Sequence, residues 1–496
     1  MNQTYPVIVI GAGPIGLATA AHLIERKQDF RVLEAGGAPG AAMAAWGHIK
    51  LFSTWRYNID AASRRLLETP TDTYTGDWAA PRETRLPSGA EMITEYLTPL
   101  ANHPAIAPHI SYNTRVIAVT RVRENGRGVD KSSSPNRAEA LFLVRVQNAN
   151  GTEDLLARAV IDSSGTWNTP NPVGRSGIEA IGESEARNAG FITSPLPDPL
   201  GTDLERFANK TILVLGAGHS AANTLISLGR LRAKYPETTI LWGLRGAASP
   251  VRLYGGGVAD ELPARGQLGT SLRRLVENQD IDVLEHVSVS ALEAGDRLTV
   301  VLADNTNLVV DMVVPATGFR PDLMILSELR LDMDQIVEAP RALGPLIDPE
   351  FHSCGTVSAH GESVLAHPEP NFYIVGMKSY GRAPTFLLAT GYEQVRSIAA
   401  ALAGDRVAAD LVELQLPESG VCSTDLAGSC DQPNSTEPTK NCATPETESA
   451  QNTVPESSEP SPLSDGSCCG TPQPPKIGFA TGTLHGHNEL LVQDNA

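Results

Sequence analysis

The sequence of 496 residues predicts an α/β protein with parallel sheets followed by a disordered tail. Short apolar runs alternate with helical patterns along most of the chain, which is typical of strands that are joined by crossover helices. A glycine-rich segment that begins at Val7 is repeated by a similar segment that begins at Ile212. Residues 417–476 contain no Phe, Trp or Tyr, and such a segment buries too little apolar surface to fold. We therefore expect two Rossmann-like, three-layer nucleotide-binding domains before the tail.

The composition supports a large core and excludes some partners. Hydrophobic residues make up 41% of the chain and charged residues 19%, which is ordinary for a globular protein. The net charge of −18 repels phosphate backbones and anionic membranes, so we expect no nucleic-acid and no membrane partner. The first five residues carry no positive charge of the kind that opens a secretory signal, which favours a cytoplasmic location.

The first glycine-rich segment has the pattern of a dinucleotide-binding turn. Gly11-x-Gly13-x-x-Gly16 follows a β-branched run at 7–10 and precedes a helical pattern at 15–25. The first glycine allows the tight turn, the second lets the backbone approach a pyrophosphate, and the third lets the helix pack on the strand. The alternative is a glycine-rich turn in an ordinary βαβ unit.

An acidic residue completes this first pattern. The strand expected at 30–33 ends at Glu34, whose carboxylate can accept hydrogen bonds from ribose hydroxyls. Pro14 lies where the helix begins and belongs to the same predicted site. The pyrophosphate turn and the ribose acid together suit FAD.

The second glycine-rich segment predicts a second cofactor. Gly216-x-Gly218-x-x-Ala221 follows a strand expected at 211–215, and alanine at the third position still permits close helix packing. His219 and Ser220 lie inside this motif, and His219 either lies near a nicotinamide or caps the helix.

The strand after the second motif indicates which dinucleotide binds. It is expected at 239–243, and Arg245 follows it where an acid would recognise NAD. Arginine attracts a 2′-phosphate, so we expect NADPH; the alternative is a solvated surface arginine. Two dinucleotide sites in one chain predict hydride transfer from NADPH to FAD.

Three further stretches resemble the two-dinucleotide-binding flavoproteins, especially the flavin-containing monooxygenase group. They are 160–167, 314–322 and the pair 371–376 with 389–394, and the resemblance covers roughly residues 5–408. It implies that the chain leaves the NADPH domain at Thr317 and Gly318. It also implies that Gly376 and Gly391 allow close backbone approach at the flavin, the alternative being simple turn glycines.

The resemblance also implies domain boundaries and an activity. The FAD domain comprises 1–170 and 319–408, the NADPH domain is inserted at 171–318, and 409–496 is a mostly disordered tail. NADPH reduces FAD, and reaction with molecular oxygen forms a flavin hydroperoxide that oxidises S, N or As of a small-molecule substrate. Residues 260–266, residues 377–385 and the cysteine-bearing tail resemble flavin monooxygenases found in bacterial arsenic-resistance gene clusters.

The sequence departs from the monooxygenase pattern at one motif. The hallmark F-x-G-x-x-x-H should start at Phe191, but Thr193 and Pro197 stand where glycine and histidine belong. One alternative is therefore an NADPH-dependent reductase of a thiol-bound metal or metalloid. Another is a non-catalytic redox or metalloid-binding scaffold. A usual disulfide reductase is excluded, because Cys354 is the only cysteine before the tail.

Several other residues are candidates, and no catalytic residue is assigned. The adjacent thiols of Cys468 and Cys469 suit a soft metal or trivalent arsenic, or they are free thiols in a reducing cytosol. Cys354 is a nucleophile or an inert thiol, and His367 lines the active site or occupies a turn. A group after the first domain's second strand either lines the flavin or forms core with surface charge: Trp46, His48, Trp55, Arg56 and Tyr57.

Overall fold

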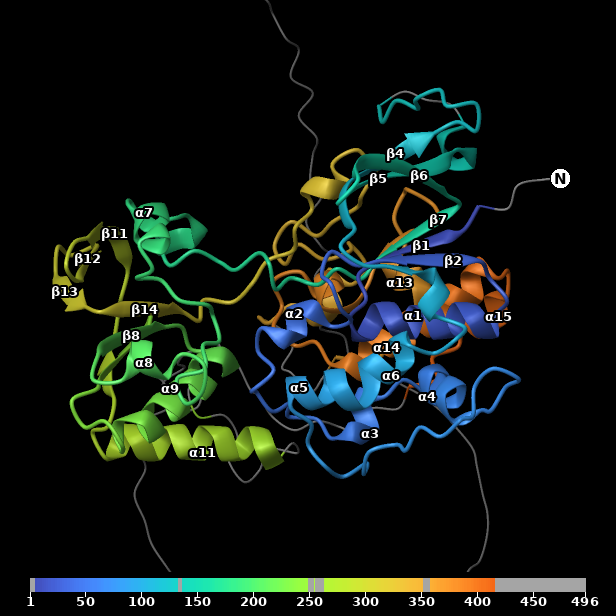
Figure 1. The fold of residues 1–496 in the computed structure, drawn as a ribbon. Coiled ribbons are helices and arrows are strands. Elements are labelled where there is room, and N and C mark those ends of the chain that lie inside the picture. Colours follow the sequence, from blue (N-terminus) through green and yellow to red (C-terminus); the bar gives the residue numbers. More distant parts are fainter. Residues whose placement is uncertain (1–4, 133–135, 249–253, 255–262, 351–356, 415–496) are drawn as a thin grey trace, which may run out of the picture. The chain divides into compact units, whose positions relative to one another are not determined.

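The computed structural model of the chain describes residues 5–132, 136–248, 254, 263–350 and 357–414 (Figure 1). Two parallel sheets organise this described part. Helices cover one face of each sheet, and a three-stranded antiparallel sheet covers the other face. The repeated three-layer arrangement confirms the Rossmann-like α/β fold that the sequence predicts.

The first sheet has the strand order β15-β7-β1-β2-β3, with every pairing parallel. Alternate residues of β1 face opposite layers: Val7 and Val9 pack with helices, and Ile8 and Ile10 pack against the antiparallel sheet β4-β5-β6. The predicted strands at 7–10 and 30–33 are confirmed as β1 and β2. The strands are β1 Val7–Ile10, β2 Phe30–Leu33, β3 Ile110–Ser111, β4 Arg115–Val122, β5 Leu141–Asn148, β6 Gly151–Ala157, β7 Ala159–Asp162 and β15 Phe372–Ile374.

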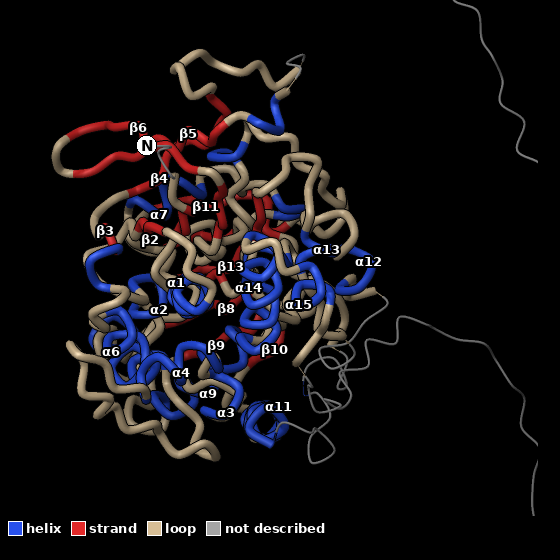
Figure 2. The backbone as a smooth tube through the Cα atoms, turned by 90° about the vertical axis from the view of Figure 1, so that its right-hand side faces the viewer, coloured by secondary structure: helices blue, strands red, loops and turns tan. Residues whose placement is uncertain are grey.

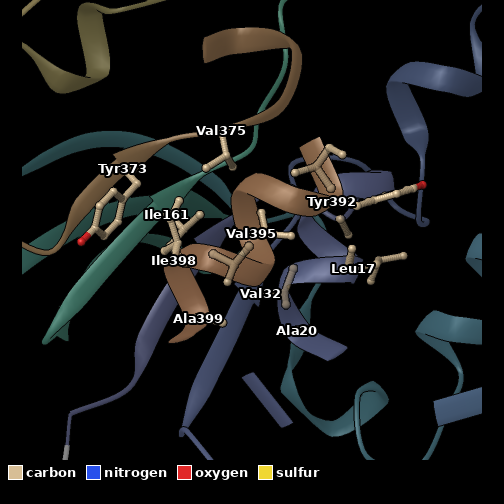
Figure 3. Packing of buried hydrophobic residues seen from close by; sticks show 14 of the residues in the cluster. Leu17, Ala20, Val32, Ile161, Tyr373, Val375, Tyr392, Val395, Ile398 and Ala399 are labelled. Carbon is tan, nitrogen blue, oxygen red and sulfur yellow. The ribbon is translucent and has the colours of Figure 1, made fainter. Parts of the chain in front are cut away.

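Two helices form the main apolar contact with this sheet. They are α1, Pro14–Glu25, and α14, Leu388–Leu402, and both are almost entirely buried. Figure 3 shows Leu17 of α1, Val395 of α14 and Val32 of β2 in one cluster. In Figure 2, β2 lies between β4 on one side and α1 on the other, which displays the three layers.

The second sheet repeats the scheme with the order β10-β9-β8-β14, again fully parallel. Ile212 and Val214 of β8 face helices, whereas Leu213 and Leu215 face the antiparallel sheet β11-β12-β13. The strands predicted at 211–215 and 239–243 are confirmed. The elements are β8 Thr211–Leu215, β9 Thr239–Gly243, β10 Asp282–Leu284, β11 Val289–Ala294, β12 Leu298–Leu302, β13 Asn307–Val310, β14 Met312–Pro315, α9 His219–Arg232 and α11 Pro263–Glu277.

The remaining elements are short connecting helices. They are α2 Ala41–Ala44, α3 Trp55–Asn58, α4 Ala61–Glu68, α5 Gly89–Glu91, the π-helix η1 Met92–Leu97, α6 Thr98–Ala101, η2 Ala107–His109, η3 Arg137–Glu139, η4 Arg175–Gly177, α7 Glu183–Asn188, α8 Leu204–Phe207, η6 Met324–Leu326, α12 Gly344–Ile347, α13 Glu362–Leu365, η7 Gly376–Tyr380 and α15 Arg406–Asp410.

The chain enters the second sheet after β7 and returns to the first sheet with β15, which pairs with β7. The exact domain boundaries at 170 and 318 stay predictions. The boundary expected at 408 falls inside α15, and Arg396 bonds to the carbonyl oxygens of Ala408 and Leu411. The described return segment therefore continues past the expected start of the tail.

Several predictions fall on residues outside the described ranges. These include most of the tail predicted at 409–496, from 415 onward, and all six cysteines, Cys468 and Cys469 among them. Within the described residues, no helix is long and apolar enough to cross a membrane.

Candidate functional site

The carboxyl ends of β1, β7 and β15 meet at one edge of the first sheet. Ile10, Asp162 and Ile374 share one register position across the three strands. The segments that follow are tied together, because the Ser163 amide donates to the Ile10 carbonyl at 3.0 Å and the Val375 amide donates to that of Asp162 at 2.9 Å. Ligands of open α/β sheets bind outside this edge.

The three glycines of the first motif meet different surroundings at this edge. Gly11 has φ +101°, and a Cβ on Gly16 would lie 1.9 Å from the Gly11 carbonyl oxygen. A Cβ on Gly13 would meet no described heavy atom within 4 Å. Pro14 is the first residue of α1, and Gly13 precedes it as the N-cap. The open side of the turn therefore lies at Gly13, beside the helix N-terminus.

Glu34 holds the first turn in place from the end of β2. Its Oε2 accepts the Ala12 amide and its Oε1 accepts the Gly36 amide, both at 2.7 Å. A carboxylate has about four lone-pair positions, so two remain for ribose hydroxyls. The predicted ribose contact is compatible with this geometry and stays a prediction.

The second motif has the same construction. Gly216 has φ +129°, and a Cβ there would lie 2.0 Å from the Ala316 carbonyl oxygen. A Cβ on Gly218 would meet no described heavy atom within 4 Å, and Ala221 is fully buried against the sheet. The open side again lies at the second glycine, next to the N-terminus of α9.

The other predicted residues of this second site lie around that turn. His219 is the first residue of α9 and Gly218 is its N-cap; the His219 ring stands 4.8 Å from the ring of Phe52. Ser220 follows it and is partly buried, while Arg245 is exposed just after β9. The structure leaves Arg245 accessible to a 2′-phosphate.

Thr317 and Gly318 lie in a paired crossover. The Thr317 hydroxyl donates to the Asn171 carbonyl at 2.8 Å, and the Asn171 amide donates to the Gly318 carbonyl at 2.9 Å. Gly318 has φ +87°, which glycine adopts without strain. These contacts give both residues a structural role where the two chain crossings run side by side.

Gly376 and Gly391 are positions of close approach. Gly376 has φ +68°, and a Cβ there would lie 3.0 Å from Ile15 Cγ1. A Cβ on Gly391 would lie 2.5 Å from Ile15 Cδ1 and 2.8 Å from Phe386 Cζ. Both glycines leave room for the side chain of Ile15, which belongs to the first motif. The N-terminal turn of α14 therefore packs closely against α1.

Sequence reasoning missed a buried ion pair at this edge. Lys378 Nζ lies 2.7 Å from Asp162 Oδ2 and 3.1 Å from Ser164 Oγ, and both charged side chains are at most 1% exposed. The signal was an aspartate that ends an otherwise apolar strand. Its partner is 216 positions away, so no local pattern could identify it.

The residues predicted as a group after β2 lie partly in the core and partly at the surface. Trp55 is fully buried, and its Nε1 has no hydrogen-bond partner among the described residues. Trp46 packs at the edge of the same cluster, whereas Arg56 is exposed over the ring of Tyr57. His48 Nε2 lies 3.0 Å from the Pro197 carbonyl oxygen. Both tryptophans pack in or against the core cluster, and the lining of the flavin by this group stays a prediction.

His367 lies away from the carboxyl edge. It precedes β15, its Nδ1 accepts the Asp332 amide at 3.3 Å, and its ring stands 5.9 Å from that of Phe372. Burial lowers the pKa of His367 to about 4. The turn interpretation fits this position, and the active-site interpretation does not.

Comparisons with known proteins agree with this geometry. Residues 6–96 match a family model described as FAD dependent oxidoreductase. Bacillithiol disulfide reductase from Bacillus cereus is 18% identical with a TM-score of 0.57, covering 81% of this chain and 99% of that one. The chain shares the fold of this reductase.

Two further solved structures are similar. The Staphylococcus aureus bacillithiol disulfide reductase is 15% identical with a TM-score of 0.54, covering 82% of this chain and 99% of that one. A flavin-containing monooxygenase from Stenotrophomonas maltophilia is 20% identical with a TM-score of 0.48, covering 81% and 99%. Comparison with curated proteins gives no match.

The residues at the first carboxyl edge fit FAD. The turn is open at Gly13, where a pyrophosphate can approach the backbone, and α1 presents its N-terminus there. In the described part, one buried polar group without a hydrogen-bond partner lies on the same helical side of the sheet, at Trp55 Nε1. Such groups are costly unless a ligand or water satisfies them.

Proposed function

We propose that the protein is an NADPH-dependent FAD oxidoreductase that oxidises a soft heteroatom (S, N or As) of a small molecule with molecular oxygen. The supporting observation is the pair of fingerprint turns, each open at its second glycine and each at the carboxyl edge of a parallel sheet. FAD, when bound, supplies hydride acceptance and the reaction with oxygen.

The chain's own residues bind and orient the cofactors in this proposal. Gly13 and the start of α1 hold one pyrophosphate, and Gly218 and the start of α9 hold the other. Arg245 selects the 2′-phosphate of NADPH. The buried Tyr380 and the partly buried Phe386, whose rings lie 5.2 Å apart, would limit the access of water to the N-terminal turn of α14.

The test is a comparison of aerobic and anaerobic turnover. We expect a yellow protein whose flavin absorbance bleaches with NADPH under anaerobic conditions. In air, a thioether, an amine or a trivalent arsenical should raise oxygen and NADPH consumption and should appear as the oxygenated product. NADPH oxidation that yields only hydrogen peroxide with every substrate class would argue against oxygenation.

A second candidate is an NADPH-dependent reductase of a thiol-bound metal or metalloid. It is favoured by the missing monooxygenase histidine, because Pro197 stands at that position. Anaerobic, NADPH-driven reduction of such a substrate would support it. A protein that binds both nucleotides without turnover in either assay would instead be the non-catalytic scaffold.

A further inference from the structure

We propose that Lys378 is a positioning residue for the bound dinucleotide, one whose buried ammonium stabilises negative charge on it. The inference rests on the proposed FAD site at the first motif. Lys378 lies in η7, which begins at Gly376 directly beyond β15 and therefore at the carboxyl edge.

The burial of this ion pair is energetically costly and calls for an explanation. The side chain of Lys378 is 1% exposed and that of Asp162 is 0% exposed, so both charges have lost their hydration. The attraction within such a pair often fails to repay that loss, and apolar residues of the same size can be equally stable. The rest of β7 is apolar and fully buried, so an aspartate at its end is the exception.

The ion pair is also linked to the fingerprint turn through Ser164. The Ser164 hydroxyl donates to Asp162 Oδ1 at 2.6 Å and accepts from Lys378 Nζ at 3.1 Å. The Ser164 amide donates to the same carboxylate oxygen at 3.0 Å. Ser164 Cα would lie 3.3 Å from a Cβ on Gly11, so one residue separates the ammonium from the turn.

Two of the three N–H donors of the Lys378 ammonium have acceptors among the described residues, at Asp162 and Ser164. The neighbouring Gly376 amide is already used, because it donates to Gln394 Oε1 at 2.8 Å. The remaining donor suits a phosphate oxygen or a ring carbonyl oxygen that gains negative charge on reduction.

A second buried cluster provides a matched control. Arg121 Nε lies 2.8 Å from Glu369 Oε1, and both side chains are 1% exposed. The other guanidinium nitrogens of Arg121 donate to the carbonyl oxygens of Ala140 and Pro370. Glu369 precedes β15 and so lies at the amino edge, where no dinucleotide is expected.

The experiment compares K378M, D162N and the double variant with the control variant E369Q in the full chain. We would measure the FAD dissociation constant of each apoprotein, the two-electron midpoint potential of the bound flavin and the thermal unfolding midpoint. K378M should weaken FAD binding at least about tenfold, and the reduced form about tenfold more than the oxidised form, which lowers the potential by about 30 mV. D162N leaves an unpaired ammonium and should raise the potential.

The opposite signs separate a charge effect from a structural one. A merely structural pair would make both single variants lose FAD affinity and shift the potential in the same direction, and either result would overturn the inference. The double variant lacks both charges of this pair, so it should fold if K378M does not. Because the two single shifts have opposite signs, its potential should lie between those of the single variants, and a potential outside that range would also count against Lys378. E369Q should lower only the unfolding midpoint.

The result that would refute the proposed FAD site differs from the result that would refute the role of Lys378. A wild-type protein that binds no FAD would refute the proposed site itself. A wild-type protein that binds FAD, together with a K378M variant of equal affinity and potential, would refute only the role of Lys378.

Discussion

Gly16 faces the carbonyl oxygen of Gly11 so closely that a Cβ on Gly16 would lie 1.9 Å from that oxygen. The same motif contains Gly13, where a Cβ would meet no described heavy atom within 4 Å. Packing within the protein therefore requires glycine at the third position and not at the second. The proposed approach of a pyrophosphate to the backbone would account for glycine at the second position.

This contrast makes Gly13→Val a clean test of the FAD site. Gly13 has φ −80° and ψ −174°, extended values that valine adopts readily, so the variant should fold. Its side chain fills the space that a pyrophosphate needs, so we expect FAD binding to weaken more than about tenfold, or ~1.4 kcal/mol. Flavin absorbance and circular dichroism measure the two properties. Gly16→Val is the contrasting variant and should lose the fold. Full flavin content in Gly13→Val would show that FAD does not bind at this turn.

Local patterns predicted the parts of the fold that local physics determines. The strands β1, β2, β8 and β9 have the expected bounds, because β-branched runs end at glycine turns or at an acidic residue. The polar segment at 125–138 connects β4 and β5. Its Arg137 is nonetheless buried on Glu369, which polarity alone could not reveal.

The interactions that sequence reasoning missed join distant residues. Lys378 meets Asp162 only because β15 returns beside β7, and Gln394 reaches Gly376 only because α14 lies over that edge. Likewise, Gly391 faces Ile15 across two helices rather than across a turn. These contacts depend on the order of strands in the sheet, which no window along the sequence contains.

Arg245 should determine the preference for NADPH over NADH. A charge-assisted bond to the 2′-phosphate contributes about 1.5–3 kcal/mol, so Arg245→Ala should weaken NADPH about ten- to a hundredfold and leave NADH nearly unchanged. Flavin reduction rates at varied NADPH and NADH measure both affinities. Arg230, an exposed arginine near the opposite end of α9, is the control position. Equal losses for the two nucleotides would give Arg245 a structural role.

His367 should make the protein less stable in mild acid. Burial lowers the pKa of His367 from 6.5 to about 4, so the unfolded chain takes up a proton first as the pH falls. The stabilisation is complete above pH 6.5 and is lost toward pH 4. From pH 7 to 5 this loss amounts to about 2 kcal/mol in the free energy of unfolding. His367→Asn keeps an acceptor for the Asp332 amide and should flatten this pH dependence in urea titrations.

The control for this titration is His286→Asn. His286 is exposed and has φ +56°, a conformation that asparagine tolerates. It should reproduce the wild-type pH dependence. An unchanged slope in His367→Asn would assign the acid sensitivity to other groups.

The tail beyond the described residues should be dispensable for folding and flavin reduction but not for binding soft ions. Truncation after Leu416 retains Arg396 and its partner Glu413, which lie 3.3 Å apart, so FAD content should stay intact. Cys468 and Cys469 are adjacent, and once one thiolate has bound arsenite the other is held nearby at little entropic cost. Replacing both with serine should therefore reduce arsenite binding and leave NADPH-driven flavin reduction unchanged. Arsenite titration of free thiols in both proteins measures this. Identical curves would leave the tail cysteines without a role in metalloid capture, and a loss of flavin on truncation would show that the tail contributes to the folded unit.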